Sequence, residues 1–281
     1  MTNHNILDML HLPRTRNDKL LFIVFWLGGL FTLYYECCLV LASYHDSWNG
    51  YVTFHVTFSA VLALYIYLYM FMLISSDIST NSIIIKNGDL SEGWKYCQRC
   101  QRNAPPRSHH CKCCDLCILK RDHHCWFAGY CVGYSNHRYF ICMAFYMSLA
   151  GIYANIYNWE FFLKVKGGLA WSTVPGLLAP HVGLIFGVYT WYEFFITLTT
   201  TVGALFTFLF VWLLAIQIIQ FSTGQVKYER KNNIFDYSTG YKNTLKEIFG
   251  SAGLWVFLIP FIPTKLPGDG TRFAKVDRKL N

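Results

Sequence analysis

Charged side chains are scarce in this chain. Asp, Glu, Lys and Arg make up 14% of its 281 residues, whereas they form roughly a quarter of a soluble domain. The deficit is concentrated, because residues 52–75, 139–159 and 194–221 contain none of the four types and residues 20–43 contain only Glu36. Each run reaches the roughly 20 residues that a helix needs to cross a bilayer. Core helices of a soluble protein seldom stay uncharged this long or occur four times, so we expect an α-helical integral membrane protein with four transmembrane helices.

Basic residues are absent from the expected loop at 44–51 and sparse between the third and fourth runs. Of the 24 Lys and Arg residues, three precede residue 20, nine lie between 76 and 138, two lie between 160 and 193, and ten follow residue 221. Cytoplasmic segments of membrane proteins are enriched in these residues. We therefore expect both termini and the 76–138 loop in the cytoplasm. The net charge of +8 follows from this bias and suits anionic lipid, so no nucleic acid partner is expected.

One uncharged segment complicates this division. Residues 167–192 lack charge but carry Pro175 and Pro180. A fifth span there would move the basic tail to the opposite face from the basic loop, so we expect a re-entrant or membrane-hugging hairpin. The expected parts are a cytoplasmic N-terminal tail (1–19), two transmembrane helices with a short lumenal loop (20–75), a cytoplasmic cysteine-rich domain (76–138), two further transmembrane helices with an apolar lumenal hairpin at about 160–193 (139–221), and a cytoplasmic C-terminal tail (222–281).

Cysteine and histidine are concentrated in the expected cytoplasmic loop. Eight cysteines and four histidines lie within the 35 residues from Cys97 to Cys131. Cysteine pairs two residues apart, followed by histidine and more cysteine, are typical of tetrahedral zinc sites. In a reducing compartment such clusters favour metal ligands over disulfides, and the stretch after Trp94 has too few apolar residues to fold without metal. Cys37 and Cys38 are expected to be packing residues of the first helix.

The twelve candidate ligands exceed the eight that two closed sites require, and the surplus falls at Asp122-His123-His124-Cys125. A free thiol is mostly protonated at neutral pH. A neighbouring imidazole can accept its proton, and a carboxylate can orient that imidazole. A metal-stiffened loop with a spare thiol is thus a scaffold for covalent catalysis, although all four residues could instead complete the metal sites.

The loop resembles the cysteine-rich domain of the DHHC protein S-acyltransferases (palmitoyltransferases), as a divergent member. Two tail motifs, Asn243-x5-Phe249-Gly250 and Gly268-Asp269-Gly270, also resemble that family. The matching loop pattern is Cys97-x2-Cys100, then Pro106-x-Ser108-x-His110-Cys111-x2-Cys114-x2-Cys117-x4-Asp122-His123-His124-Cys125-x5-Cys131-Val132-Gly133-x2-Asn136-x3-Phe140.

The resemblance implies a role for most of these side chains. Cys125 would be the nucleophile, His123 its base, and Asp122 the group that orients His123. His109 and Cys113 match no ligand position. Two interleaved structural zinc sites are implied, one formed by Cys97, Cys100, His110 and Cys117 and the other by Cys111, Cys114, His124 and Cys131.

The resemblance also implies the reaction. A long-chain acyl group, palmitoyl, would pass from acyl-CoA to Cys125 as a thioester and then to cytoplasmic cysteines of membrane-associated protein substrates, at a bilayer of the endomembrane system (Golgi or endoplasmic reticulum). Basic residues of the loop and the tail could meet the CoA phosphates, although a solvated positive face explains them equally well: Lys95, Arg99, Lys227, Arg230 and Lys231.

Several positions depart from the family pattern. Trp126-Phe127 stands where the family has Pro-Trp, and Tyr130 replaces an Asn. Asp77-Ile78-Ser79 replaces Asp-Pro-Gly, and Ser222-Thr223-Gly224-Gln225 is interpreted as a degraded Thr-Thr-x-Glu in which Thr223 could bond Asp122. An alternative function is therefore a catalytically weak, zinc-folded membrane adaptor or chaperone. A zinc transporter is disfavoured because the expected spans lack a path of metal ligands.

Overall fold

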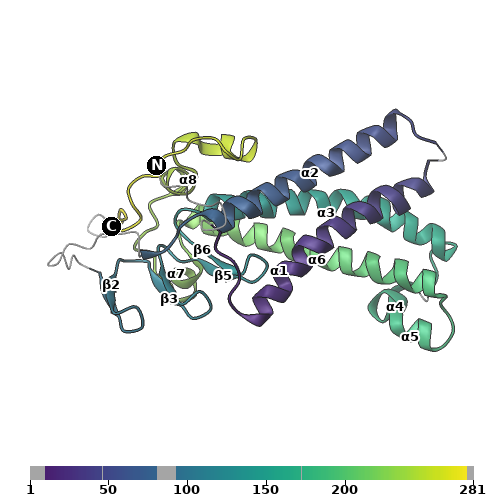
Figure 1. Cartoon of the computed structure of the whole chain (residues 1–281), viewed down its shortest axis with the longest axis horizontal. Coiled ribbons are helices and arrows are strands. Elements are labelled where there is room, and N and C mark those ends of the chain that lie inside the picture. The colour runs from purple at the N-terminus through teal and green to yellow at the C-terminus, as the bar shows by residue number, and fades with distance from the viewer. Residues whose placement is uncertain (1–9, 46, 81–92, 172, 277–281) are drawn as a thin grey trace. The chain divides into compact units, whose positions relative to one another are not determined.

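The computed structural model describes residues 10–45, 47–80, 93–171 and 173–276. Within them, helices dominate and short strands fill the cysteine-rich region (Figure 1). Residues 81–92 of the expected loop and the outermost residues of both expected tails lie outside the described residues. In chain order the elements are α1 (Arg16–Tyr35), η2 (Glu36–Val40), η3 (Leu41–Ser43), α2 (Gly50–Ser75), β1 (Lys95–Cys97), β2 (Arg102–Ala104), β3 (His109–Cys111), β4 (Leu116–Ile118), β5 (His123–Cys125), β6 (Tyr130–Val132), α3 (His137–Lys166), α4 (Thr173–Leu178), α5 (Pro180–Ile185), α6 (Trp191–Thr223), α7 (Lys227–Lys231), α8 (Tyr241–Phe249) and η5 (Gly250–Phe257).

Four helices in the described part of the chain are long and apolar enough to cross a membrane. They are Arg16–Ser43, Gly50–Ser75, His137–Lys166 and Trp191–Thr223. Large apolar side chains on them are exposed, among them Leu27, Leu64, Leu205 and Phe208, as expected where lipid covers a helix. The prediction of four transmembrane helices is confirmed. Each helix extends beyond its uncharged run, because charged residues at a helix end can reach the polar interface.

The uncharged segment between the third and fourth spans forms two short helices. The helices α4 and α5 have six residues each, which at 1.5 Å per residue is far too short to cross a bilayer. Pro180 occupies the first turn of α5, where its missing N–H costs nothing. The described part of this segment therefore contains no fifth span.

The cysteine-rich region is built from three antiparallel hairpins, which pair β1 with β2, β3 with β4, and β5 with β6. Each strand has only three residues. The register places His110 opposite Cys117 in one hairpin and His124 opposite Cys131 in another. Two hairpins thus each bring a histidine and a cysteine of one expected zinc site side by side. Hairpins this short are not stable alone, so the fold depends on cross-links between them.

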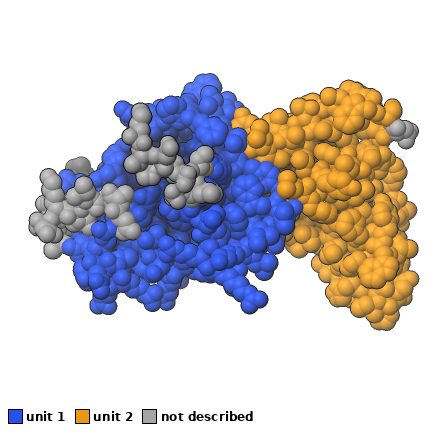
Figure 2. Space-filling view, viewed as in Figure 1, with its two compact units in different colours: residues 1–27, 67–143, 215–281 blue, residues 28–66, 144–214 orange. Residues whose placement is uncertain are grey.

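The chain folds as two compact units, coloured separately in Figure 2. One comprises residues 1–27, 67–143 and 215–281 and contains the cysteine-rich hairpins and the C-terminal tail. The other comprises residues 28–66 and 144–214. Its core is formed by Tyr35, Val40, Phe161, Phe162 and Ile196.

A buried charge cluster joins the tail to the hairpins within the first unit. Arg107 donates to both carboxylate oxygens of Glu229, at 2.7 and 2.8 Å, and to Glu247 at 3.1 Å. Lys120 contacts the same Glu247 at 2.7 Å. Burial and the neighbouring Arg107 charge lower the pKa of Lys120 to about 8, although Glu247 opposes the change. These pairs hold α7 and α8 against the loop, and α7 borders the expected active site.

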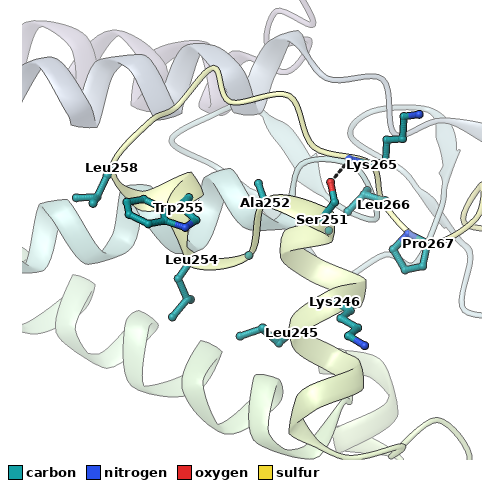
Figure 3. A pocket seen from close by; sticks show the side chains of 12 residues that line it. Leu245, Lys246, Ser251, Ala252, Leu254, Trp255, Leu258, Lys265, Leu266 and Pro267 are labelled. Carbon is teal, nitrogen blue, oxygen red and sulfur yellow. Dashed lines mark hydrogen bonds between the residues drawn. The ribbon is translucent and has the colours of Figure 1, made fainter.

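The C-terminal tail also meets the second span. The hydroxyl of Tyr69 in α2 donates to the carbonyls of Val256 and Phe257, at 2.5 and 2.7 Å. The tail motif from Asn243 to Phe249 lies on the helix α8, which begins at Tyr241. An open hollow of about 750 Å³ lies in this tail, with Leu254 and Trp255 in its lining (Figure 3). Its lining contains none of residues 122–125, so it is distinct from the expected thiol site.

Candidate active site

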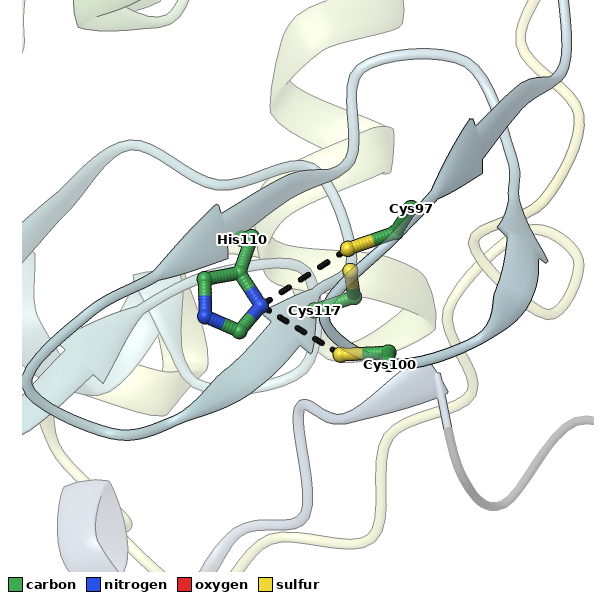
Figure 4. Close-up of side chains that lie close together, drawn as sticks. All are labelled: Cys97, Cys100, His110 and Cys117. Atoms are coloured by element: carbon green, nitrogen blue, oxygen red, sulfur yellow. Dashed lines mark hydrogen bonds between the residues drawn. The ribbon is translucent and has the colours of Figure 1, made fainter.

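One group of potential metal ligands lies in the first two hairpins. Cys97, Cys100, His110 and Cys117 offer ligand atoms that all lie within 4.8 Å of one another. Their side chains converge on a common centre (Figure 4). The Nδ1 atom of His110 lies 3.8 Å from the sulfur of Cys97 and 3.3 Å from that of Cys100. These are the four residues that the resemblance implies for one site.

The second group is more deeply buried. It contains Cys111, Cys114, His124 and Cys131, again within 4.8 Å. The Nδ1 atom of His124 lies 3.6, 3.4 and 3.7 Å from the three sulfurs in that order, and the sulfurs of Cys114 and Cys131 are 3.7 Å apart. Because the hairpin of β3 and β4 carries ligands of both groups, it cannot leave its place without disturbing both.

Both groups fit a tetrahedral zinc ion. Zinc–sulfur bonds near 2.3 Å and zinc–nitrogen bonds near 2.0–2.1 Å require, at tetrahedral angles, S···S separations of about 3.8 Å and N···S separations of about 3.6 Å. The sulfur pair and the Nδ1–sulfur distances match these values within a few tenths of an ångström. A Cys3His set is moreover the donor set of closed structural zinc sites. The groups can therefore hold one metal ion each.

Cys125 belongs to neither four-residue group. It is the last residue of β5 and is 6% exposed, and it is among the groups that raise the pKa of the nearby His123 ring. The two remaining residues of the cluster also stay outside these groups: the ring of His109 packs on that of Tyr228, with centroids 4.2 Å apart, and Cys113 lies near Asp18 and His124. The thiol of Cys125 is thus free of both clusters yet anchored beside one of them.

Asp122 is buried and accepts hydrogen bonds from four groups. Nδ1 of His123 lies 2.8 Å from Oδ2. The side-chain amides of Gln217 and Gln220 donate at 3.1 Å each, and the backbone amide of Lys227 donates to Oδ1 at 2.8 Å. Burial alone would raise the pKa of this carboxyl, but the hydrogen bonds and the charges of His123 and His137 hold it well below its ordinary range. Asp122 is therefore a fixed carboxylate.

His123 lies between this carboxylate and the thiol. Its ring also packs edge-on against Phe140, with centroids 4.7 Å apart. Burial lowers the pKa of His123, but the hydrogen bonds and charges of Asp122 and Cys125 raise it to about 9. With Nδ1 committed to Asp122, the other ring nitrogen is left to take a proton, and the high pKa means that the ring takes one readily. This is the arrangement of an activated nucleophile.

The tail contributes to this site through residues that sequence reasoning did not identify. Thr223, expected to bond Asp122, instead donates to the backbone carbonyls of Ile219 and Gln220 at 3.0 and 3.3 Å. The contact to Asp122 comes from the amide of Lys227, four residues later. The acidic residue of this region is Glu229, which binds Arg107 and accepts from the amide of Val226 at 3.0 Å. The interpretation of Gln225 as the acidic position was therefore wrong, because the helix α6 extends to Thr223 and moves the tail turn further along the chain.

Two positions that depart from the family pattern, Trp126 and Tyr130, flank the turn between β5 and β6. Trp126 is 64% exposed and Tyr130 is buried. Gly129 has a positive φ of 59°, which glycine adopts at no steric cost, and its amide donates to the carbonyl of Trp126 at 3.2 Å. The two ligand groups and the strand His123–Cys125 are present beside this turn.

Comparison with known proteins agrees with this geometry. The sequence model described as DHHC palmitoyltransferase matches residues 90–234. A protein of Danio rerio named probable palmitoyltransferase ZDHHC24 is 33% identical over 206 residues, which cover 72% of this chain and 69% of that protein. The Homo sapiens protein of the same name is 32% identical over 211 residues, or 72% of each chain. A protein of Arabidopsis thaliana named probable protein S-acyltransferase 7 is 29% identical over 157 residues, which cover 56% of this chain and 34% of that protein. The chain therefore belongs to the DHHC palmitoyltransferase family.

Proposed function

We propose that this chain is an acyl-CoA-dependent protein-cysteine S-palmitoyltransferase that works through an acyl thioester on Cys125. The observation that carries the proposal is the thiol of Cys125, which lies outside two complete Cys3His groups and two residues from His123, whose pKa it raises. His123 in turn contacts the buried carboxylate of Asp122 at 2.8 Å. A nucleophile, a base and an orienting group in this order support acyl transfer.

The reaction has two half-reactions, acyl transfer to Cys125 and acyl transfer from Cys125 to the substrate. The sulfur of Cys125 forms a bond to the acyl carbonyl carbon, the carbon–sulfur bond to CoA breaks, and His123 takes the thiol proton and passes it to the departing CoA thiolate. A cysteine thiol of a protein substrate then attacks the same carbonyl carbon. That step restores the Cys125 thiol and leaves the substrate acylated. Asp122 keeps the ring of His123 oriented in both steps.

Two structural zinc ions would hold this strand in place. One would be bound by Cys97, Cys100, His110 and Cys117, and the other by Cys111, Cys114, His124 and Cys131. When bound, each ion cross-links two hairpins that are too short to be stable alone. Because His124 directly precedes Cys125, the second group fixes the backbone of the nucleophile without touching its thiol.

Exposed basic side chains surround the polar end of the site. Lys227 presents its backbone amide to Asp122 while its side chain is exposed, and Arg230 and Lys231 follow on the same short helix. Positive charge there suits the phosphates of CoA, and the four spans support an acyl chain that lies in lipid. The excess of Lys and Arg in the loop and the C-terminal tail supports our further proposal that both termini and the cysteine-rich loop face the cytoplasm. The family resemblance supports a membrane of the endomembrane system, the Golgi or the endoplasmic reticulum.

The proposal is tested by autoacylation of the full chain in detergent with a clickable palmitoyl-CoA, wild type beside Cys125→Ser. We expect a hydroxylamine-labile label on wild type alone, with two zinc ions bound per chain in both proteins. A catalytically weak adaptor is the second candidate, because Trp126 and Tyr130 depart from the family pattern next to the nucleophile. The absence of label on folded, zinc-loaded wild type would overturn the enzyme proposal in favour of the adaptor.

A further inference from the structure

The residues just before the first span contact the hairpin that carries Cys125. We call residues 10–18 the N-terminal segment; they and the hairpin belong to the same unit. The segment begins with a backbone hydrogen bond of 3.0 Å from His11 to Ile74 at the end of α2. From there it passes the turn between β5 and β6 and ends at Asp18 in the first turn of α1.

Asp18 reaches a metal-ligand candidate. Its Oδ1 lies 3.2 Å from Nε2 of His124, and the side chains are only 4% and 7% exposed. The other oxygen, Oδ2, accepts from the hydroxyl of Thr15 at 2.7 Å, and the amide of Asp18 donates back to that hydroxyl at 3.2 Å. Asp18 is therefore a buried acidic side chain whose orientation is fixed from one side by Thr15 and which faces His124 on the other.

Each of the two ring nitrogens of His124 faces a different set of side chains. Nδ1 faces the sulfurs of Cys111, Cys114 and Cys131 at 3.4–3.7 Å, whereas Nε2 faces Asp18. A neutral imidazole carries one N–H. A carboxylate that accepts from Nε2–H leaves the lone pair on Nδ1, which is the form that can bind zinc. Carboxylate–histidine–metal triads of this kind orient the ring and strengthen the ligand.

Two further contacts hold the segment on the same hairpin. The rings of His11 and Tyr130 stack with centroids 4.5 Å apart and planes within 3° of parallel. A β-carbon at Gly129 would overlap Pro13, so the turn and the segment are in direct contact. In the register of this hairpin, Tyr130 lies opposite Cys125. The segment thus contacts the residue before Cys125 through Asp18 and the residue paired with Cys125 through His11.

We propose that Asp18 is a positioning residue for the reaction centre: it fixes His124 in the tautomer that binds zinc through Nδ1, and the N-terminal segment thereby sets the position of Cys125. The second part rests on the proposed function, whereas the first concerns the metal group alone. In this arrangement the N-terminal segment contributes to the reaction centre together with the cysteine-rich loop. Tyr130 contributes as well, because its ring stacks on that of His11 and so helps to hold the segment.

The test measures zinc release from the full chain in detergent to a chromogenic chelator. Loss of such a supporting carboxylate typically costs roughly 10- to 100-fold in metal affinity or activity. We expect Asp18→Ala to release one of two zinc ions about 10- to 100-fold faster than wild type and to form acyl-enzyme more slowly. Asp18→Asn, whose amide oxygen can face Nε2 of His124 but lacks charge, is expected to lie between the two.

Glu193 provides a matched control, because it is an acidic residue in the first turn of a long helix, as Asp18 is, but belongs to the other unit. It lies in the first turn of α6 and accepts from the amide and hydroxyl of Thr190, three residues earlier, at 2.8 and 2.9 Å. Glu193→Ala removes an equivalent helix-start acid and is expected to release both zinc ions at the wild-type rate. Equal acceleration in both alanine variants would reduce the role of Asp18 to helix capping and overturn the proposal.

Asp18→Asn keeps the assay informative if Asp18→Ala does not fold. Wild-type release rates in Asp18→Asn and in every folded Asp18→Ala sample would overturn the proposal. Zinc release needs no acyl transfer, so the two proposals fail separately. Wild type that forms no acyl-enzyme, together with rapid loss of one zinc ion from Asp18→Ala, would refute the proposed function and support the assignment of Asp18.

Discussion

The side-chain amide of Gln217 joins Asp122 to His137. Its Nε2 donates to Oδ2 of Asp122 at 3.1 Å, and its Oε1 accepts from Nε2 of His137 at 2.7 Å. Gln217 and His137 are 4% and 3% exposed, so neither exchanges this partner for water. A polar chain therefore runs from α3 through α6 to the carboxylate that orients His123.

This relationship predicts that Gln217→Leu slows acyl-enzyme formation. The variant removes one hydrogen bond to a buried carboxylate and leaves those from Gln220 and Lys227. A hydrogen bond to a charged group contributes about 1.5–3 kcal/mol, which corresponds to roughly 10- to 100-fold in rate. Single-turnover labelling with palmitoyl-CoA measures the change. Ile218→Ala on the same helix turn, where the side chain is exposed, is the control and should label at the wild-type rate. Equal rates for Gln217→Leu and wild type would remove the polar chain from the mechanism.

The charge cluster predicts a loss of stability on Arg107→Met. That variant leaves the buried carboxylate of Glu229 without its bidentate partner, while Glu247 keeps Lys120. Removing one partner of a buried pair costs about 3–5 kcal/mol, so the unfolding temperature of the full chain in detergent should fall by several degrees or more. Arg107→Met/Glu229→Leu should recover part of the loss, because no unpaired charge remains. An unfolding temperature equal to that of wild type in the single variant would show that the cluster does not hold the tail.

The two metal groups predict different outcomes for neighbouring residues. His124→Ala removes a ligand, so zinc content should fall from two ions to one per chain, and the yield of folded protein should fall with it. Cys125→Ser removes no ligand and should retain both ions. Elemental analysis of the purified variants decides between them. A fully metallated, stable His124→Ala protein would remove His124 from the ligand set.

The proposed topology predicts the outcome of glycosylation mapping in microsomes. An acceptor sequence inserted in the tail near Gly268 should stay unmodified, because the tail is placed in the cytoplasm. The same acceptor inserted near Gly168, between α3 and α4, should be modified and serves as the positive control. Modification of the tail acceptor would place the ten basic residues after residue 221 in the lumen and refute the topology.

Local patterns predicted the features that depend on local chemistry. The uncharged runs gave the four spans because burial in lipid demands apolar side chains along the whole helix. The spacing of the cysteines indicated tetrahedral zinc sites because such sites constrain the short connections between ligands, whereas the division into two groups was implied by the family resemblance. The hairpins, whose strands have three residues each, were not predicted, because strands this short have no periodicity to detect.

Contacts between distant segments were beyond the reach of the sequence. Gln217 and Gln220 lie in an uncharged span, where an amide does not stand out, yet both bond Asp122 almost a hundred residues earlier. Asp18 lies in a tail whose polarity was unremarkable by composition, but its partner is His124. Glu229 was missed because the tail turn was placed four residues too early. A signal was available for it, since it is an acidic residue just after the last span.

The most direct test of the central claim is to locate the acyl group on the protein. Wild type and Asp122→Asn are incubated with palmitoyl-CoA, digested without reducing agent and analysed by peptide mass spectrometry. The account predicts a thioester on the peptide that contains Cys125 in wild type, and much less of it in Asp122→Asn, with other cysteines such as Cys37, Cys113 and Cys142 unlabelled. An acyl group found on one of those cysteines but not on Cys125 would contradict it.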